Sequence, residues 1–293
     1  MKIKGNLLLL TAAFIWGVTF VTQMMGMDEL GPFTYAMSRY FLAVLFMAGL
    51  YLATNASRNR QKDNGSYDAG WKAGLIAGSF MLVATSMQQI AMVYTTAGKT
   101  AFITALYIII VPLGAMLLGK KIHGENWLGA LLALLGLYLL SIQGEVSLNF
   151  GDVIVIVSSF FWAGQILYID RKAALVDVIE LSTAQMFMCF AGSTLGTILF
   201  EDINFAPIVR AWFPIFFGGV MSGGIAFTLQ IVGQRYAEPG QAAIIMSFEA
   251  VFGALASFIV LGEVMTSAQI FGCVLMFAGV IVTQLRGILR PRA

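Results

Sequence analysis

The chain has 293 residues, of which 59% are hydrophobic and only 11% are charged, and its formal net charge is +2. Because a soluble domain carries about 25% charged residues, this composition excludes an ordinary water-facing surface. The small net charge gives no electrostatic basis for binding nucleic acid. The sequence therefore predicts an all-α membrane protein whose surroundings are a lipid bilayer.

Ten apolar segments follow one another along the chain, and turn residues and charges separate them. Each is about as long as the ~20-residue helix that crosses a hydrocarbon core of ~30 Å, so we expect ten transmembrane helices. The predicted helices are 6–26, 33–53, 71–93, 98–118, 125–142, 151–169, 178–200, 211–234, 240–261 and 267–286. The longest connection, 54–70, is rich in Asn, Ser, Lys and Arg and is predicted to be a loop.

Basic residues gather on one side when the connections are assigned alternately to the two sides of the membrane. That side holds Lys2, Lys4, Arg58, Arg60, Lys62, Lys72, Lys120, Lys121, Arg171, Lys172, Arg235, Arg286, Arg290 and Arg292, whereas the loops of the other side hold only Arg210. Positively charged short loops stay in the cytoplasm. We therefore expect a multi-pass protein of the cell (inner) membrane with both termini in the cytoplasm.

The second half of the chain repeats the first weakly, at an offset of about 145 residues. Residues 13–17 match residues 159–163, and a slightly smaller offset superposes Gln88 on Gln230. With five helices in each half, the second copy starts from the opposite side of the membrane. The fold class that we predict is thus ten transmembrane helices arranged as two inverted five-helix repeats, a design that places a substrate site near the midplane.

Short motifs in both halves share a family pattern. They are Phe14-Ile15-Trp16-Gly17-Val18-Thr19-Phe20, Gly31-Pro32, Ser38-Arg39-Tyr40, Tyr94-Thr95-Thr96-Ala97-Gly98-Lys99, Glu238-Pro239-Gly240, and Leu261-Gly262-Glu263 followed by Gly272 and Gly279. In order and spacing the chain resembles an EamA-type ten-helix transporter of the drug/metabolite transporter superfamily. The resemblance implies EamA-like repeats over 1–145 and 146–293 in one membrane domain, a central cavity, and the fifth and tenth helices at the periphery. Members move varied compounds, often outward.

Glu249 lies near the middle of the apolar segment 240–261. Because an ionised carboxylate is costly at the centre of a bilayer, we expect it to face a polar interior, where it binds an amino group or takes up a proton. The alternative is a protonated carboxyl that joins two helices by a hydrogen bond. Arg39, two turns into the second helix, either extends to the outer interface or turns inward to bind a substrate carboxylate. An inward Arg39 together with Glu249 would suit a zwitterion.

Buried amides and aromatic residues complete the candidate substrate-binding set. They are Gln88, Gln230, Gln165, Trp16, Trp162 and Tyr107. Amides within a membrane either bind a ligand or join helices by hydrogen bonds, and aromatic residues either line a cavity or pack in the core or against lipid.

Glycines and a proline mark helix contacts and bends. Gly129 with Gly136, and Gly272 with Gly279, recur seven residues apart and predict a close helix–helix contact. Gly218-Gly219, Gly223-Gly224 and Pro112 are places where a helix is expected to bend or to approach another backbone.

The function that we predict is a secondary transporter that moves a small amphipathic metabolite, an amino acid or a related compound, by alternating access, with export as the direction. An intramembrane enzyme is the rival from another class, but the sequence contains no HExxH motif, no P-loop and no nucleophile beside a histidine. A receptor or scaffold is a further alternative. We expect no catalytic residue, no cofactor and no metal site. The partners expected are a small-molecule substrate and the bilayer; proton coupling is left open, as is the choice between monomer and homodimer.

Overall fold

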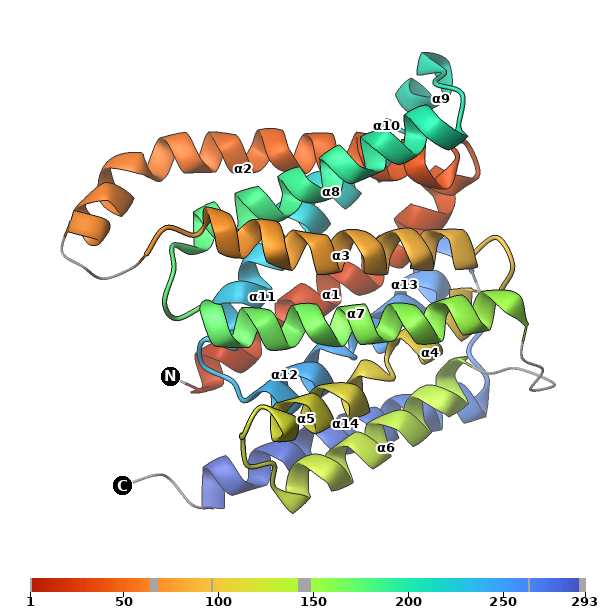
Figure 1. The fold of residues 1–293 in the computed structure, drawn as a ribbon. Helices are drawn as coiled ribbons and strands as arrows, with labels where there is room; N and C mark the ends of the chain where they lie inside the picture. The colour runs from red at the N-terminus through yellow and green to blue at the C-terminus, as the bar shows by residue number, and fades with distance from the viewer. Residues whose placement is uncertain (1, 64–67, 96, 142–148, 263, 290–293) are drawn as a thin grey trace.

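The computed structural model describes residues 2–63, 68–95, 97–141, 149–262 and 264–289. Long helices lie side by side in this part of the chain, with their axes roughly aligned (Figure 1). The β-pairing found there is a single bridge between Asp68 and Val176, and no strand is formed among the residues described. The prediction of an all-α fold is therefore confirmed.

The helices lie within or overlap the predicted apolar segments, but several segments are divided into shorter helices. The first half contains α1 (Lys2–Met27), α2 (Pro32–Asp63), α3 (Trp71–Ala91), α4 (Ala97–Thr104), α5 (Tyr107–Leu117) and α6 (Gly124–Ser141). The second half contains α7 (Phe150–Lys172), α8 (Val178–Phe200), α9 (Phe205–Arg210), α10 (Trp212–Phe216), the π-helix η1 (Phe217–Ala226), α11 (Phe227–Gln234), α12 (Pro239–Met246), α13 (Glu249–Leu261) and α14 (Ser267–Leu289).

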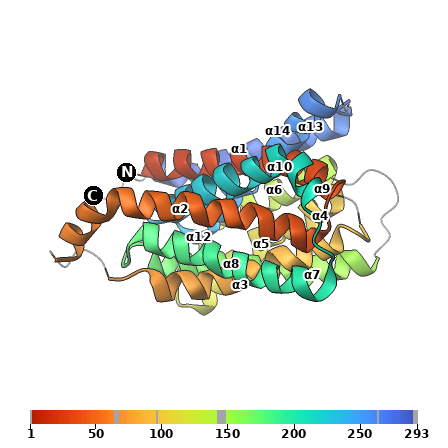
Figure 2. The same cartoon turned by 90° about the horizontal axis from the view of Figure 1, so that it is seen from above.

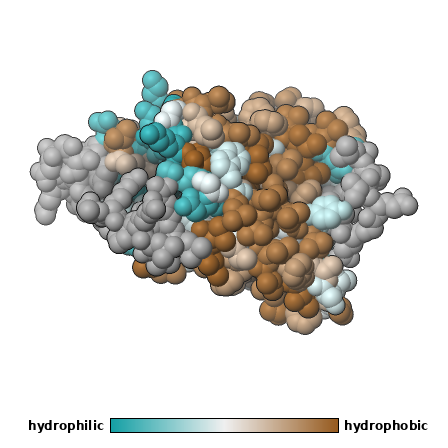
Figure 3. Space-filling model, turned by 90° about the horizontal axis from the view of Figure 1, so that it is seen from below, coloured by the Kyte–Doolittle hydropathy of each residue, from teal (hydrophilic) through white to brown (hydrophobic). Residues whose placement is uncertain are grey.

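The helices have the length and surface of membrane spans. Within the described ranges, eight segments are long and apolar enough to cross a membrane, and two shorter apolar helices, Phe102–Leu117 and Ser267–Thr283, accompany them. One face of the molecule is largely hydrophobic across its middle (Figure 3). The start of α1 and the end of α14 lie at the same end of the bundle in two perpendicular views (Figures 1 and 2). The chain is thus built as a multi-pass membrane protein.

The predicted loop 54–70 is wrong over its first part, because α2 continues to Asp63. The residues that extend the helix include Ala, two Arg, Gln and Lys, which are good helix formers, and no Gly or Pro interrupts them. The first strong turn signal after Thr54 is the dipeptide Asn64-Gly65. Polarity therefore marked the end of the apolar span and not the end of the helix.

Carboxylates at both ends of α8 hold the starts of α2 and α3. The carboxylate of Glu201 accepts hydrogen bonds from the backbone N–H groups of Phe33 and Thr34, both at 2.8 Å. Glu180 accepts one from the backbone N–H of Gly70, also at 2.8 Å. These N–H groups lie at helix starts, where no carbonyl of the same helix pairs with them. The carboxylates thus satisfy them and fix two cavity walls against α8.

The two glycine pairs bring α6 and α14 into close contact, as predicted, at one edge of the bundle (Figure 1). A Cβ atom added to Gly279 would lie 2.7 Å from the carbonyl oxygen of Gly129, and Gly136 faces Gly272 in the same way. Backbones approach this closely only where side chains are absent.

The fourth apolar segment, predicted as one helix, is interrupted between α4 and α5. The N–H of Ile108 bonds to the carbonyl of Ala105 and that of Ile109 to Leu106, both at 2.9 Å, so these bonds span three residues where an α-helix spans four. Pro112 lies inside α5, lacks an N–H and crowds the carbonyl of Ile108. The bend predicted at Pro112 therefore lies a few residues earlier in the chain, between α4 and α5.

The ninth segment, also predicted as continuous, is interrupted between α12 and α13 without a proline. The Ser247 hydroxyl donates to the carbonyl of Ile244 at 2.8 Å, and the Phe248 N–H donates to Ile245 at 3.2 Å. A serine that bonds to the preceding turn competes with the regular ladder. The two interruptions lie at corresponding places in the two halves of the chain.

The glycine-rich part of the eighth segment forms the π-helix η1, which includes Gly218-Gly219 and Gly223-Gly224 and packs on α2. A Cβ on Gly219 would lie 2.5 Å from the carbonyl oxygen of Arg39, so the two backbones nearly touch. π-Helices are rare and often occur at functional sites.

Candidate functional site

A cavity lies in the middle of the bundle, among α1, α2, α3, the two interrupted helices, α7, η1 and α11. The empty space in and around it is about 660 Å³, open solvent included. Its lining consists of Trp16, Thr19, Phe20, Gln23, Arg39, Tyr40, Thr85, Gln88, Thr104, Tyr107, Trp162, Ile166, Ser222, Phe227, Gln230, Met246 and Glu249.

Seven of the eight residues predicted to bind substrate lie in this lining. They are Glu249, Arg39, Gln88, Gln230, Trp16, Trp162 and Tyr107. The eighth, Gln165, is fully buried behind the cavity surface, and its amide exchanges hydrogen bonds with Gln230 at 3.1 and 3.4 Å. The structure thus brings the predicted residues together, and their roles stay predictions.

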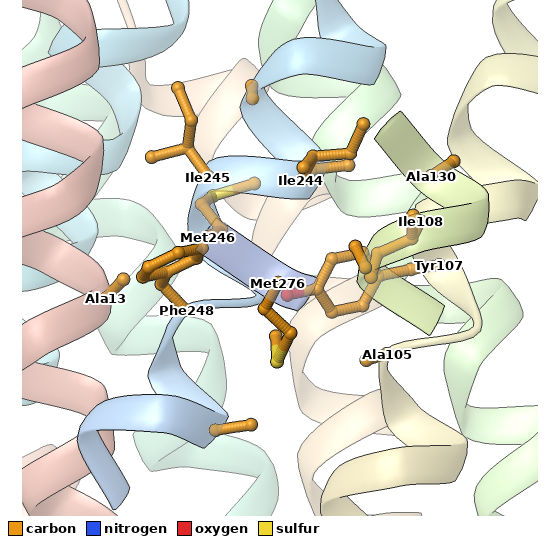
Figure 4. Packing of buried hydrophobic residues seen from close by; sticks show 14 of the residues in the cluster. Ala13, Ala105, Tyr107, Ile108, Ala130, Ile244, Ile245, Met246, Phe248 and Met276 are labelled. Atoms are coloured by element: carbon orange, nitrogen blue, oxygen red, sulfur yellow. The ribbon is translucent and has the colours of Figure 1, made fainter. Parts of the chain in front are cut away.

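Glu249 and Tyr107 meet at the junction of the two interrupted helices. Each is the first residue of its half-helix, α13 and α5, and their separation of 142 residues equals that of Gln88 and Gln230. The Tyr107 hydroxyl donates to Glu249 Oε1 at 3.4 Å. The Tyr107 ring extends from α5 into the packed residues around the start of α13, which include Phe248 (Figure 4). The alternative role of Glu249, a carboxyl that joins two helices by a hydrogen bond, would require such a partner, and Tyr107 supplies it.

Arg39 turns inward and does not extend to the outer interface. Its side chain is buried, with 6% exposed, and Nη2 donates to the Tyr40 hydroxyl at 3.1 Å. The guanidinium carbon lies 4.6 Å from the ring centre of Tyr40 and 5.6 Å from that of Tyr35, which are cation–π distances. Between described residues, no salt bridge joins Arg39 to Glu249 or to another carboxylate. The guanidinium charge is stabilised by aromatic rings and remains without an acidic partner there.

The buried amides also join helices. Gln88 Nε2 donates to Thr104 Oγ1 at 3.0 Å, which connects α3 with α4. Gln23, which the sequence analysis missed, donates to Gln89 and connects α1 with α3. Gln23 could have been found from the sequence, because it is an amide within an apolar segment, the same signal that singled out Gln88.

Two tryptophans at corresponding positions of the two halves pack on one phenylalanine. The ring centres of Trp16 and Phe227 are 4.8 Å apart, and those of Trp162 and Phe227 are 6.3 Å apart with nearly parallel planes. All three residues line the cavity. Phe227 gave no signal in the sequence, where phenylalanine is abundant.

The polar residues of the site are suited to binding and offer no metal centre. In the described part of the chain, no three or more His, Cys, Asp or Glu side chains are grouped so as to hold a metal ion. Cys189 and Cys273 are free thiols.

Similar proteins are found by both sequence and structure. The profile of the EamA-like transporter family matches residues 3–142 and 149–285. An uncharacterized transporter of Archaeoglobus fulgidus is 30% identical over 97% of this chain and 87% of its own length. A probable amino-acid metabolite efflux pump of Escherichia coli is 24% identical over 95% of this chain and 94% of its own. A protein of known crystal structure, 19% identical, superposes over 98% of both chains with a TM-score of 0.77, which shows a shared fold.

Proposed function

The chain belongs to the EamA-like transporter family, and on this premise we propose that it is a secondary transporter that carries a small amphipathic metabolite out of the cell by alternating access. The observation that carries the proposal is the central cavity, because one acid, Glu249, and one base, Arg39, both line it among aromatic walls. A site of this kind fits a compound with an amino group, a carboxylate and an apolar part. An amino acid or a related compound is the substrate that we propose.

Two inverted five-helix repeats, 1–145 and 146–293, are the architecture that we propose for this transporter. Contacts between the two halves support it, because each has a counterpart with the halves interchanged. α1 packs on α12 and α13 as α7 packs on α4 and α5, and α2 packs on η1 as α8 packs on α3. The family profile also matches once in each half. In this proposed architecture, α4–α5, η1 with its flanking helices, and α12–α13 each count as one span, which gives ten spans among the described residues.

The state of the transport cycle follows from the two interrupted helices. If both termini are cytoplasmic, α5 and α12 are the cytoplasmic halves of these helices, and they pack together. Gly240 of α12 stands against Pro112 of α5, where an added Cβ would be in ordinary contact at 3.5 Å from Pro112 Cγ. A contact on the cytoplasmic side of the cavity supports a state in which that side is closed.

Residue chemistry assigns the binding roles in this proposal. Glu249 binds the amino group of the substrate or exchanges a proton during the cycle, and Arg39 binds the carboxylate. Gln88 and Gln230 form polar parts of the wall. The name of the Escherichia coli relative, a probable amino-acid metabolite efflux pump, supports both the substrate class and the outward direction.

The location proposed is the cell (inner) membrane, with both termini in the cytoplasm, as the distribution of lysine and arginine indicates. The oligomeric state proposed there is a monomer or a homodimer.

Flux into sealed liposomes that contain only this protein tests the proposal. Labelled amino acids are followed at several pH values for the wild type, for Glu249→Gln and for the matched control Glu125→Gln, which makes the same chemical change in the first turn of α6, outside the cavity. We expect flux in the wild type and the control. Glu249→Gln should be folded but should lose flux or its dependence on pH.

Two outcomes contradict the proposal in different ways. Normal flux with unchanged pH dependence in Glu249→Gln would remove Glu249 from the mechanism. Absence of any flux from the folded wild type would favour the rival classes, an intramembrane enzyme or a receptor.

A further inference from the structure

Three residues that line the cavity each carry a buried N–H group without an acceptor. These groups are the indole Nε1 of Trp16, the indole Nε1 of Trp162 and the guanidinium Nε of Arg39. A buried donor that is left unpaired costs about 1–3 kcal/mol, and native structures contain few of them. The concentration of three such donors around one cavity indicates that another state of the protein pairs them.

Several other polar side chains of the lining are paired with the protein itself. Gln88 donates to Thr104, Gln230 exchanges bonds with Gln165, and Tyr107 donates to Glu249. Other buried polar atoms without a partner occur among the described residues outside the lining: the donor Nδ2 of Asn126, the hydroxyl of Thr34, and the acceptor oxygens of Gln185 and Gln234. The imbalance at the cavity is therefore an excess of donors, which a ligand relieves only by bringing acceptors.

Aromatic rings pack around these donors. Trp16 and Trp162 occupy corresponding positions in the two halves, and both rings pack on Phe227. Arg39 is held by its hydrogen bond to Tyr40 and by two aromatic rings, with no carboxylate within 4.0 Å among the described residues. A permanent positive charge that lines the same cavity as two indole N–H donors favours an anionic acceptor such as a carboxylate.

We propose that Trp16 and Trp162 are specificity-determining hydrogen-bond donors that, together with Arg39, bind the carboxylate of the transported compound. The inference rests on the proposed function, since it takes the cavity to be the substrate site, and it deepens that function by giving the two indoles a polar role in addition to that of an apolar wall. Each N–H is covered in this structure, so binding includes a rotation of the indoles against Phe227. The substrate class is a small carboxylate with an apolar side chain, and a compound that lacks the carboxylate is rejected.

Matched probes separate the carboxylate from the rest of the ligand. Leucine, 4-methylpentanoate and 3-methylbutylamine share one apolar side chain and differ in which charged groups they carry; phenylalanine, 3-phenylpropanoate and 2-phenylethylamine form a second set. Binding to the purified full chain in detergent is measured by thermal shift, because a ligand of the folded state raises the apparent Tm. We expect the acids and amino acids to bind and the amines to bind about tenfold more weakly or not at all.

Two conservative variants test the indoles. Trp16→Phe and Trp162→Phe keep an aromatic ring against Phe227 but remove the N–H together with part of the bicyclic ring. Loss of the donor should weaken binding of the carboxylates about tenfold and leave binding of the amines unchanged, whereas loss of ring size alone should weaken both. Trp212→Phe, at an exposed position of α10, is the control for the same chemical change and should bind like the wild type. Arg39→Lys keeps the charge and removes the Nε donor, so it tests the site independently if an indole variant does not fold.

The outcomes distinguish this inference from the proposed function. Liposome flux of leucine that is retained, with carboxylate affinities unchanged in both indole variants, overturns the inference and leaves the transporter intact. Equal affinity of the wild type for the amines and the acids also overturns it. If the folded wild type neither binds nor moves any of the six probes, both the carboxylate site and the proposed substrate class are wrong.

Discussion

Replacement of Tyr107 by phenylalanine tests the contact that joins the two interrupted helices. The substitution removes only the hydroxyl oxygen, 3.4 Å from Glu249 Oε1, and the phenyl ring keeps the packing of a side chain that is 4% exposed. Hydrogen bonds to charged groups contribute about 1.5–3 kcal/mol at normal distances, but 3.4 Å is long for an O–H···O bond. We therefore expect a contribution of about 0.5–1 kcal/mol.

A double-mutant cycle isolates this contribution. The wild type, Tyr107→Phe, Glu249→Met and the double variant are compared by thermal unfolding in detergent, where methionine replaces the carboxylate by an apolar chain of similar length. The double variant should lose less stability than the two single variants together, by the coupling energy of about 0.5–1 kcal/mol. The coupling should shrink at acidic pH, because a neutral carboxyl is a weaker acceptor than a carboxylate.

Tyr138→Phe serves as the control for the hydroxyl, since Tyr138 lies at the surface of α6, outside the cavity. It should leave the stability unchanged and should not couple to Glu249→Met. Strictly additive losses for Tyr107→Phe and Glu249→Met would refute the hydrogen bond and, with it, the idea that the two half-helices communicate through these side chains.

Two further predictions concern stability away from the cavity. Gly279→Val places a side chain against the carbonyl of Gly129 and should cost about 1–3 kcal/mol of stability, seen as a lower Tm with unchanged ligand affinity. The control Gly49→Val, where no atom lies within 4 Å of the added Cβ, should not lower the Tm. Equal losses in both variants would contradict the glycine contact. Glu201→Ala leaves two N–H groups at the start of α2 without their acceptor. It should speed hydrogen exchange there and lower the free energy of unfolding by about 1–3 kcal/mol. Exchange no faster than in the control Asp202→Ala would show that the cap is unimportant.

Much of the fold was predictable because it depends on local properties. The length of each apolar segment determined the position of the helices, and the glycine pairs on α6 and α14 predicted their close contact, which the structure confirms. The extension of α2 to Asp63 was missed, because hydropathy reports where a span ends while helix propensity and turn residues decide where the helix ends. The interruptions near Ala105 and Ser247 were missed for a related reason, since a few three-residue hydrogen bonds leave the apolar pattern unchanged.

The sequence by itself identified which side chains are unusual in a membrane, and the tertiary structure decided which of them meet. Glu249, Arg39 and Gln88 were found because a polar group in an apolar helix is costly wherever the helix lies. The contact of Tyr107 with Glu249, the aromatic surroundings of Arg39 in place of an acidic partner, and the position of Gln165 behind the cavity depend on how helices far apart in the chain are rotated against one another. That rotation is fixed by packing between helices, which no local pattern records.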